Sequence, residues 1–224
     1  MEVLVLNDPE TTARAEEQLP LLHLLLGDSV ARDSGMRTRA AQDAFFCAAR
    51  GGATWSSLAE RLPGVLEGWS REAAAQERRR GSVVVWMSGN DVYSQQTLLP
   101  SYSDDSLEKA AQHAVLITKR LLAETSQVLV LGPLPRLSGD MIGLSWEQSA
   151  FFQLERRLLH RLPSEVTFVT LGRQLTRKSL GKHTLTHQCL EWYALDRTHL
   201  SRSGYGKLAG AAKFPDWLKL AAAE

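Results

Sequence analysis

The sequence contains little cysteine, and its opposite charges almost cancel. The two cysteines among its 224 residues, Cys47 and Cys189, could form one disulfide at most, so the chain has no disulfide framework. We therefore expect a reducing compartment, the cytoplasm. A net charge of +1 provides no general attraction to nucleic acid or to an acidic membrane, so binding of either would need a local patch. Small molecules and neutral polymers are the default partners.

Long apolar runs, internal repeats and low-complexity linkers are also lacking. No window approaches about 18 uninterrupted apolar residues, so no membrane span is predicted. The short apolar run at 3–6 has no basic residue before it, unlike a secretory signal. The apolar fraction, 44%, is that of an ordinary globular protein. We expect a single domain over 1–224, with residues 1–19 as a polar lead-in and 20–224 as the core.

Short apolar runs alternate with helical patterns along the chain. The predicted strands cover 21–26, 83–87, 128–131 and 166–171, and a further short apolar run covers 44–49. Predicted helices begin near Thr54 and Asp104, and Ser145 with Gln148 forms a capping-box pattern for a third helix. Strands separated by helices of this length indicate a mostly parallel sheet. We therefore expect a three-layer α/β fold with helices on both faces of the sheet.

Several segments allow only local predictions. The composition of 36–43 favours a helix, and Pro63-Gly64 should bend or divide the long helix in which it lies. The Glu77–Arg80 run is interpreted as a solvated helix end. Residues 172–190 are basic and contain no acid. The last helix is predicted over 208–220, with an interruption by proline.

Four polar segments need a common explanation. Three follow apolar runs, and one opens the last part of the chain: Gly27-Asp28-Ser29, Gly51-Gly52, Ser88-Gly89-Asn90-Asp91 and Asp196 to His199. The carboxyl ends of parallel strands meet at one edge of a sheet, so residues far apart in sequence converge there. We expect Asp28 and Asp91 to shape their own turns through local hydrogen bonds.

These segments supply the groups that acyl transfer requires. A serine hydroxyl needs a base, and His199 is the best-placed base for Ser29. Asp196, three residues before the histidine, can bond the second ring nitrogen and fix its tautomer. The backbone N–H groups of Ser29 and Gly52 and the side-chain amide of Asn90 would form an oxyanion hole. The glycine that precedes Gly52 could present its N–H instead.

In this order the four segments resemble the four sequence blocks of the SGNH hydrolases, also called GDSL-type esterases and lipases. The blocks appear as Gly27-Asp28-Ser29-Val30, Gly52, Ser88-Gly89-Asn90-Asp91 and Asp196-Arg197-Thr198-His199-Leu200, and they span 24–206. The resemblance implies a flavodoxin-like, five-stranded sheet of order 2-1-3-4-5. It also implies ester hydrolysis through an acyl-Ser29 intermediate, with no metal and no cofactor.

Two positions depart from the family pattern. Val30 replaces the usual leucine, and Ser88 stands where the third block usually has glycine. The serine adds a hydroxyl near the expected oxyanion site, where it either tunes activity or packs.

A narrower resemblance concerns the second and third blocks. The runs Gly51–Trp55 and Ser88–Tyr93 are similar to those of esterase domains in first-open-reading-frame proteins of LINE-type retrotransposons. This resemblance implies acetyl or lipid-type esters as substrates. It also implies peripheral membrane or RNA association through a larger parent protein.

Other interpretations stay open. The fold could serve as a non-catalytic or dual-role module that binds lipid or nucleic acid through the basic residues 173–187. An acyltransferase would use an alcohol in place of water. His183, His187 and Cys189 could suggest zinc, but no fourth ligand lies nearby, so their segment is interpreted as a solvated loop.

Aromatic residues near the predicted edge also have two interpretations. Trp146, Tyr93 and Tyr102 lie in or near loops beside that edge and could line an acyl pocket. Core or rim packing is the alternative for each of them.

Overall fold

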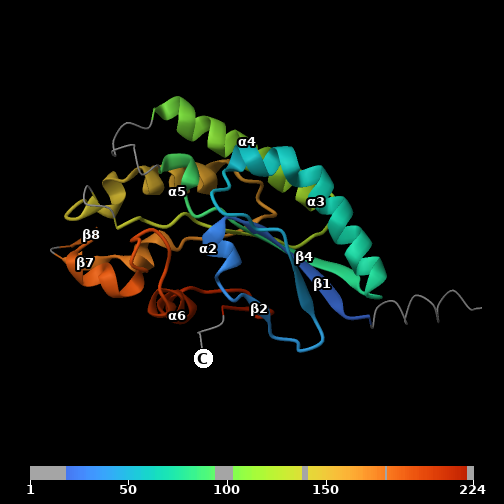
Figure 1. Ribbon diagram of the computed structural model, residues 1–224. Coiled ribbons are helices and arrows are strands. Elements are labelled where there is room, and N and C mark those ends of the chain that lie inside the picture. Colours follow the sequence, from blue (N-terminus) through green and yellow to red (C-terminus); the bar gives the residue numbers. More distant parts are fainter. Residues whose placement is uncertain (1–18, 94–102, 138–140, 180, 221–224) are drawn as a thin grey trace, which may run out of the picture.

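A five-stranded parallel sheet forms the centre of the computed structural model, which describes residues 19–93, 103–137, 141–179 and 181–220 (Figure 1). The strands are β1 (Leu21–Gly27), β3 (Ala44–Cys47), β4 (Arg79–Trp86), β5 (Val128–Leu131) and β6 (Thr167–Val169). Their order across the sheet is β3-β1-β4-β5-β6, and all four pairings are parallel. Counted along the chain this is the order 2-1-3-4-5, so the predicted topology is confirmed.

Helices cover both faces of this sheet (Figure 1). On one side lie α3 (Trp55–Ala75), α4 (Asp104–Leu122) and α5 (Ala150–Arg161). On the other side lie α6 (Arg202–Ala211) and the antiparallel pair β2 (Arg37–Thr38) and β9 (Leu218–Lys219). The short helix α2 (Ser29–Arg32) follows β1 directly. The predicted three-layer α/β arrangement is therefore confirmed.

Shorter elements complete the described part of the chain. A hairpin consists of β7 (Arg177–Ser179) and β8 (Lys182–Thr184). The 3-10 turns are η1 (Asn90–Val92), η3 (Trp146–Gln148), η4 (Gly172–Leu175) and η5 (His187–Trp192). The predicted lead-in lies outside the described residues, apart from Leu19.

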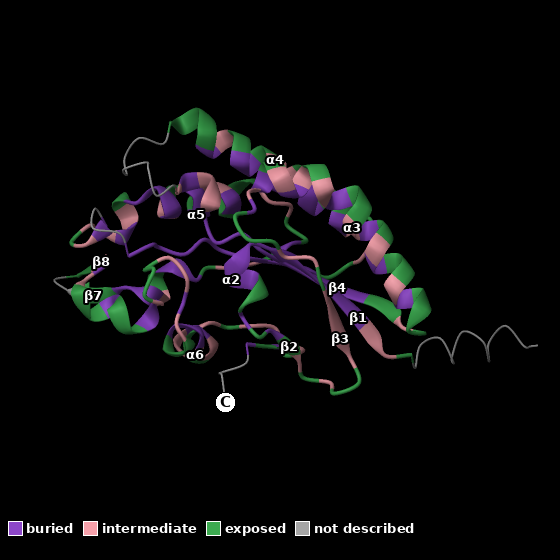
Figure 2. Cartoon of the chain, viewed as in Figure 1, coloured by how far each residue is buried: buried purple, intermediate pink, exposed green. Residues whose placement is uncertain are grey.

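Burial explains why the central strands are continuous apolar runs. Strands β1 and β4 have neighbours on both sides and helices or loops on both faces, so nearly all of their residues are buried (Figure 2). Parallel strands covered in this way have little polar alternation. The helices instead show striped burial, with one apolar face against the sheet and one exposed face.

Two local predictions are wrong because distant pairing outweighs local propensity. Residues 36–43 form no helix, since Arg37–Thr38 pairs with Leu218–Lys219 across the chain. The same pairing takes the end of the predicted terminal helix, so α6 covers Arg202–Ala211 instead. A strand partner far along the chain is invisible to helix propensity.

Three element boundaries also differ. Arg79 and Arg80 belong to β4 rather than to a helix end, and Arg80 pairs with Glu124 at 2.8 Å. Helix α5 is capped by Ser149, whose hydroxyl accepts from the N–H of Phe152, so the capping box predicted at Ser145 is wrong. Strand β6 covers only three of the six residues predicted for it.

Helix α3 is not divided at Pro63. Thr54 caps its start as predicted, and the helix continues through the proline to Ala75. Its buried face packs on the sheet, and Trp69 Nε1 donates to the carbonyl of Leu22 at 2.9 Å. These tertiary contacts compensate for the hydrogen bond that proline cannot donate.

Both cysteines are free, with Cys47 exposed and Cys189 buried. In the described ranges, no helix combines the length and the apolar character that crossing a bilayer requires.

A buried carboxyl in α5 predicts a pH-dependent stability. Glu155 is 6% exposed, and its Oε2 has no partner among the described residues. Burial raises its pKa from 4.5 to about 7, although backbone N–H groups oppose the change. Between these values the unfolded chain ionises first, so stability falls as the pH rises toward neutrality.

Glu155→Gln should therefore be more stable than the wild type at pH 8, by about 2–3 kcal/mol, and equal to it near pH 4. Urea unfolding at both pH values measures the difference. Equal midpoints at pH 8 would contradict the prediction.

Candidate active site

The turn after β1 depends on a close approach of two strands. Gly27 has a φ of +155°, and a Cβ there would lie 2.3 Å from the carbonyl oxygen of Trp86 in β4. Only glycine fits this position. The chain therefore passes directly from β1 into α2, where Asp28 Oδ1 accepts from the N–H of Val30 at 3.0 Å. Asp28 shapes the turn as expected, and Ser29 becomes the first residue of α2.

Ser29, His199 and Asp196 form one continuous hydrogen-bonded chain. Ser29 Oγ lies 2.7 Å from Nε2 of His199, and Nδ1 of the same ring lies 2.5 Å from Asp196 Oδ2. Ser29 is 9% exposed, whereas the side chains of His199 and Asp196 are 37% and 46% exposed. The structure thus brings together the three residues that the sequence selected, with the histidine and aspartate on the solvent side.

The loop that carries the histidine orients the Asp196 carboxylate. Asp196 Oδ1 accepts from the backbone N–H groups of Thr198 and His199 at 2.9 and 3.0 Å, which leaves Asp196 Oδ2 free to bond the imidazole ring of His199. Arg197 closes this turn with a φ of +58°, a conformation that is uncommon for a residue with a side chain. Burial would raise the pKa of Asp196, but hydrogen bonds from His199 and Thr198 outweigh it and lower the pKa to about 2. The carboxylate is therefore ionised at neutral pH.

Two backbone donors at this edge are unoccupied. The N–H groups of Ser29 and Gly52 have no acceptor among the described residues. Gly52 has a φ of +70°, in the left-handed region that favours glycine. The φ of Gly51 is not positive. Of the two neighbouring glycines, the turn therefore requires glycine at position 52.

Asn90 reaches the same edge with its amide already bonded. Its Nδ2 donates to the carbonyl of Ala53 at 3.0 Å and to Asp28 Oδ2 at 3.2 Å. Ala53 follows Gly52 directly, so the amide lies beside the glycine turn. An amide has two hydrogens, and both have acceptors here. Donation to a third acceptor requires that one of these bonds is shared or exchanged.

A buried network behind these groups contains a residue that the sequence analysis missed. Arg136 is 1% exposed, and its guanidinium donates to Ser88 Oγ at 2.7 Å and to the carbonyl of Thr198 at 2.5 Å. Asn90 Oδ1 lies 3.4 Å from the same guanidinium. Ser88 Oγ in turn donates to Asp28 Oδ2 at 2.5 Å. The serine hydroxyl that departs from the family pattern thus bridges a buried cation and a buried carboxylate.

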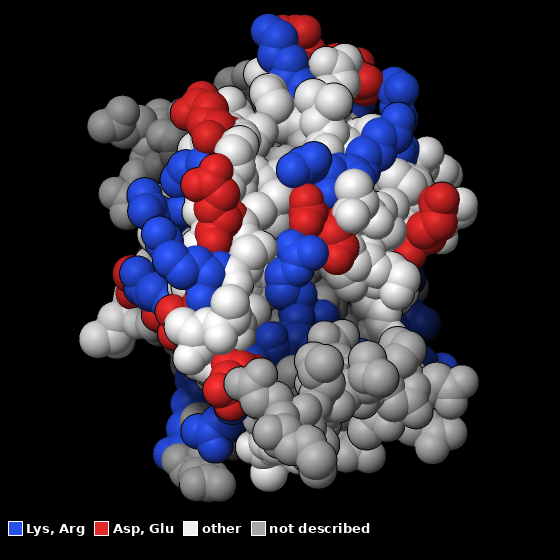
Figure 3. All heavy atoms as spheres, turned by 90° about the vertical axis from the view of Figure 1, so that its right-hand side faces the viewer, with Lys and Arg blue, Asp and Glu red and all other residues white. Residues whose placement is uncertain are grey.

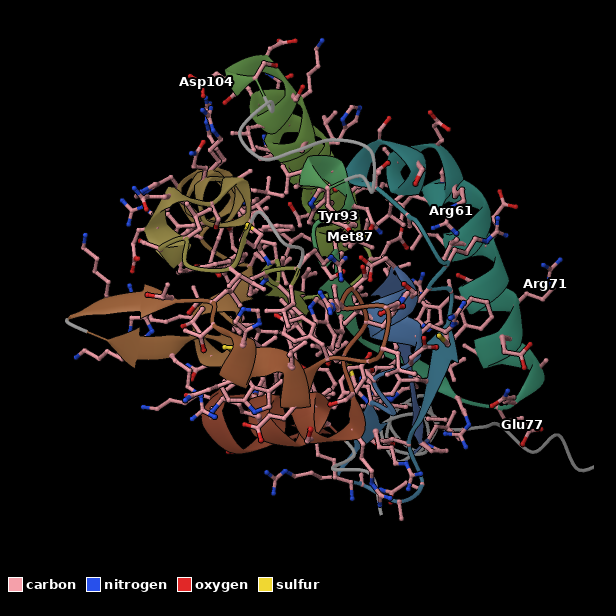
Figure 4. The ribbon with its side chains drawn as sticks, turned by 60° about the vertical axis from the view of Figure 1, so that its left-hand side comes forward. Arg61, Arg71, Glu77, Met87, Tyr93 and Asp104 are labelled. Carbon is pink, nitrogen blue, oxygen red and sulfur yellow. The ribbon has the colours of Figure 1, made fainter. Side chains whose placement is uncertain are left out.

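The guanidinium of Arg136 is removed from solvent. Burial lowers its pKa, and the nearby charge of Asp28 opposes this. The guanidinium lies over the ring of Tyr93, 5.6 Å from its centroid. Figure 4 shows Tyr93 near Met87, which follows the end of β4. Arg136 Nε has no partner among the described residues. The sequence signal was a single charge in the otherwise apolar stretch 128–137.

The loop after β5 holds the histidine loop in place. Tyr193 donates its hydroxyl hydrogen to the carbonyl of Pro135 at 2.8 Å, and the N–H of Leu137 donates to the carbonyl of Arg197 at 3.0 Å. Together with the bond from Arg136 to the carbonyl of Thr198, these contacts hold the Asp196–Leu200 segment against the Ser88–Asp91 and Gly27–Val30 segments.

Other residues that the sequence analysis singled out contribute to packing and to backbone hydrogen bonds. Asp91 also bonds beyond its own turn: its Oδ1 accepts from the N–H of Trp55 at the start of α3, at 3.0 Å. Burial raises the pKa of Asp91 to about 6. Trp146 is 1% exposed and belongs to the core, and Tyr93 is half-buried with its hydroxyl 3.3 Å from Thr198 Oγ1. Tyr102 lies outside the described residues.

The basic segment is partly neutralised by acids. Arg173 pairs with Glu147 at 3.3 Å, and Arg177 pairs with Glu191 at 2.8 Å. Arg177 also lies over the ring of Trp192, 4.6 Å from its centroid. Two of its four lysine and arginine charges are therefore not freely available to an anionic polymer.

Comparisons with known proteins concern the fold. No protein-family model matches the sequence, and no curated protein matches it significantly. A GDSL-like lipase from Bacteroides thetaiotaomicron matches with a TM-score of 0.56 at 13% identity, over 89% of this chain and 92% of the lipase. An acetylxylan esterase from Geobacillus stearothermophilus, solved as a catalytic mutant, matches with a TM-score of 0.52 at 18% identity, over 85% of this chain and 91% of the esterase. The chain therefore has the fold of the SGNH hydrolases, as predicted.

Proposed function

We propose that this chain is a carboxylic ester hydrolase of the SGNH class, with a catalytic core over 20–224, that works through an acyl-Ser29 intermediate. The observation that carries the proposal is the hydrogen-bonded chain Ser29–His199–Asp196 at the carboxyl edge of the sheet. The shared fold adds support, because the lipase and the acetylxylan esterase named above act on esters. Acetyl and lipid-type acyl esters are the proposed substrates.

The first half of the reaction transfers the acyl group to serine. His199 Nε2 accepts the hydroxyl proton as Ser29 Oγ attacks the carbonyl carbon. Asp196 keeps the proton on Nδ1 and stabilises the imidazolium that forms. The unoccupied N–H groups of Ser29 and Gly52 donate to the developing oxyanion, and Asn90 joins them once its bond to Ala53 is exchanged. The imidazolium then protonates the leaving alcohol, and the C–O bond breaks.

The second half reverses these roles with water. His199 removes a proton from a water molecule that attacks the acyl carbon, and the collapse of the second tetrahedral intermediate returns that proton to Ser29 Oγ. The products are a carboxylic acid and the free enzyme. An alcohol in place of water would yield a transferred ester, and product analysis distinguishes the two outcomes.

Active-site labelling tests the proposal directly. A fluorophosphonate probe should label the wild type at Ser29, located by peptide mass spectrometry, because only an activated serine reacts with it quickly. Ser56→Ala is the matched control, since Ser56 is an exposed serine on α3 and its loss should leave labelling unchanged. A series of p-nitrophenyl esters from acetyl to long-chain acyl then identifies the substrate class. A wild type that is neither labelled nor active on any ester would overturn the proposal.

A further inference from the structure

A groove outside the candidate active site lies between the edge strand β3 and helix α3. It has a volume of about 610 Å³ and is lined on the strand side by residues 46–50. The helix side contributes six residues, and four of them, Arg61, Gly64, Gly68 and Arg71, form a stripe. Their spacing of three, four and three places them on one face of α3. The groove contains none of the three residues of the proposed triad.

The two glycines give the groove a low floor between two arginines. A Cβ at Gly68 would contact the ring of Phe46 at 3.4 Å, so this glycine lies against the strand. A Cβ at Gly64 would have no described atom within 4 Å of it. Glycine inside a helix is less stable than alanine, and the described neighbours give no packing reason for it here. The space above Gly64 is open.

The edge of β3 and the segment 48–50 that follows it offer unpaired backbone groups to the same groove. The N–H of Ala48 donates to the carbonyl of Leu25, and that of Arg50 donates to Gly27, both at 2.9 Å. Because donors alternate along a strand, the N–H groups of Cys47 and Ala49 point away from β1. On that side of β3, no described residue accepts from either of them. An edge of this kind can pair with an extended peptide.

The charges of the groove are mainly positive and have no ion-pair partner among the described residues, although Arg61 donates to the backbone carbonyls of Ser57 and Ala48. Arg50, Arg61 and Arg71 line it, with Glu60 as the single acid. Among the residues that the structure describes, none of these arginines forms an ion pair, whereas Arg80 and Arg157 do. On the face drawn in Figure 3, lysine and arginine side chains lie among aspartate and glutamate side chains.

Arg61 in particular lacks a partner for a buried group. Its Nη2 is buried with no hydrogen-bond acceptor among the described residues. Burial lowers the pKa of this guanidinium, and repulsion from Arg50 lowers it further. An anion supplied from outside the chain would satisfy both the unused donor and the repelling charges.

We propose that this groove binds an extended acidic peptide of a partner protein, which pairs with β3 as an additional strand. Arg61 and Arg71 lie ten residues apart on α3, or about 15 Å along its axis (Figure 4). Four residues of an extended strand cover about 13 Å, and residues i, i+2 and i+4 share one face. The peptide therefore has acids at i and i+4, which meet the two arginines, and an apolar side chain at i+2 above the glycine floor.

A peptide with the sequence Glu-Thr-Val-Thr-Glu, carrying a fluorescent dye, tests the proposal by anisotropy titration against the full chain. Gly64→Leu fills the open floor without a clash, so the variant should fold and keep its ester turnover while its affinity for the peptide falls about tenfold or more. Gly210→Leu is the matched control, because Gly210 is also a helical glycine with open space around it, on α6. This control should bind like the wild type.

Two further experiments vary the charge at position 71 and the spacing of the acids in the peptide. Arg71→Glu should weaken binding of the acidic peptide and gain binding of the mixed peptide Lys-Thr-Val-Thr-Glu, whose lysine meets the substituted position while its glutamate still meets Arg61. A peptide with adjacent acids, Glu-Glu-Thr-Val-Thr, should bind more weakly than the spaced one. Equal binding of both acidic peptides, or no effect of Gly64→Leu, would mean a general cationic surface and overturn the proposal. If the chain forms a dimer that Gly64→Leu dissociates, the groove binds a second copy of the chain instead. Ester turnover is measured separately for each variant, so failure of this proposal is distinguishable from failure of the proposed function.

Discussion

Ser29→Ala should lower kcat for an activated acetyl ester by about 10⁶-fold, and His199→Ala should do the same. The first variant lacks the attacking oxygen, and the second lacks the group that accepts its proton. The Ser29 hydroxyl has one side-chain partner, Nε2 of His199, so its removal should change the free energy of unfolding by less than about 1 kcal/mol. Steady-state kinetics and urea unfolding measure the two effects separately.

The double variant distinguishes a catalytic unit from two independent contributions. Nucleophile and base act in the same step, so Ser29→Ala with His199→Ala should be no slower than either single variant. His160→Ala is the matched control, since His160 is an exposed histidine near the end of α5 and its loss should leave kcat unchanged. If Ser29→Ala kept a substantial share of the wild-type rate, another residue would be the nucleophile.

Arg136→Met should destabilise the protein by about 3–5 kcal/mol, because it leaves the buried carboxylate of Asp28 without its cationic partner. Arg136 reaches Asp28 through the hydroxyl of Ser88, at 2.7 and 2.5 Å, and both charged side chains are essentially inaccessible to water. Ester turnover should also fall, since the bond from Arg136 to the carbonyl of Thr198 helps to hold the histidine loop. Urea unfolding at pH 7 and kcat at low temperature measure the two effects.

A compensating substitution makes this prediction sharper. Asp28→Asn in the Arg136→Met background removes the uncompensated charge, so the double variant should recover part of the lost stability. Arg156→Met is the matched control, because Arg156 is exposed on α5 and forms no ion pair among the described residues. An Arg136→Met protein as stable as the wild type would show that the buried charges do not depend on each other.

Strand positions were predictable because they follow from local and repeated signals, whereas the order of the strands in the sheet was implied by the resemblance to the SGNH hydrolases. The run Leu21–Gly27 is apolar on both faces and ends in glycine, which is typical of a central parallel strand followed by a turn. Helix signals of similar strength, such as Thr54 before α3, also predicted the correct boundary. The rule that the carboxyl ends of parallel strands meet at one edge predicts that Ser29 and Asn90 lie close together. His199 follows no strand of the sheet, so its place beside Ser29 was inferred from its residue type next to Asp196 and from the resemblance.

The failures have a common physical origin in contacts between distant residues. The composition of 36–43 favours a helix, but the segment finds a strand partner in Leu218–Lys219. Ser145 and Ser149 have similar local signals, and packing of the buried face of α5 selects the second as its cap. Arg136 has no local motif at all, because its importance arises from Ser88 and Thr198, each about fifty residues or more away.

In the candidate site, too, some features were predictable from the sequence and others depend on contacts between distant residues. Sequence order and residue type brought Asn90 and Gly52 to the site, and the structure has them side by side through the bond from Asn90 to Ala53. The sequence carries no information about the occupancy of the Asn90 amide, which depends on two acceptors from other elements. Which residues meet is therefore a property of topology, whereas their hydrogen-bonding state is a property of packing.

The separation of 170 positions along the chain from Ser29 to His199 also affects how activity appears during folding. The nucleophile follows the first strand, but its base arrives with a loop near the end of the chain, which docks on the segment after β5. Contacts of such long range form late, because the entropy of closing the intervening chain has to be overcome first. A nascent or refolding chain would therefore display its serine long before that serine becomes reactive, and the onset of hydrolysis would mark the arrival of the last loop.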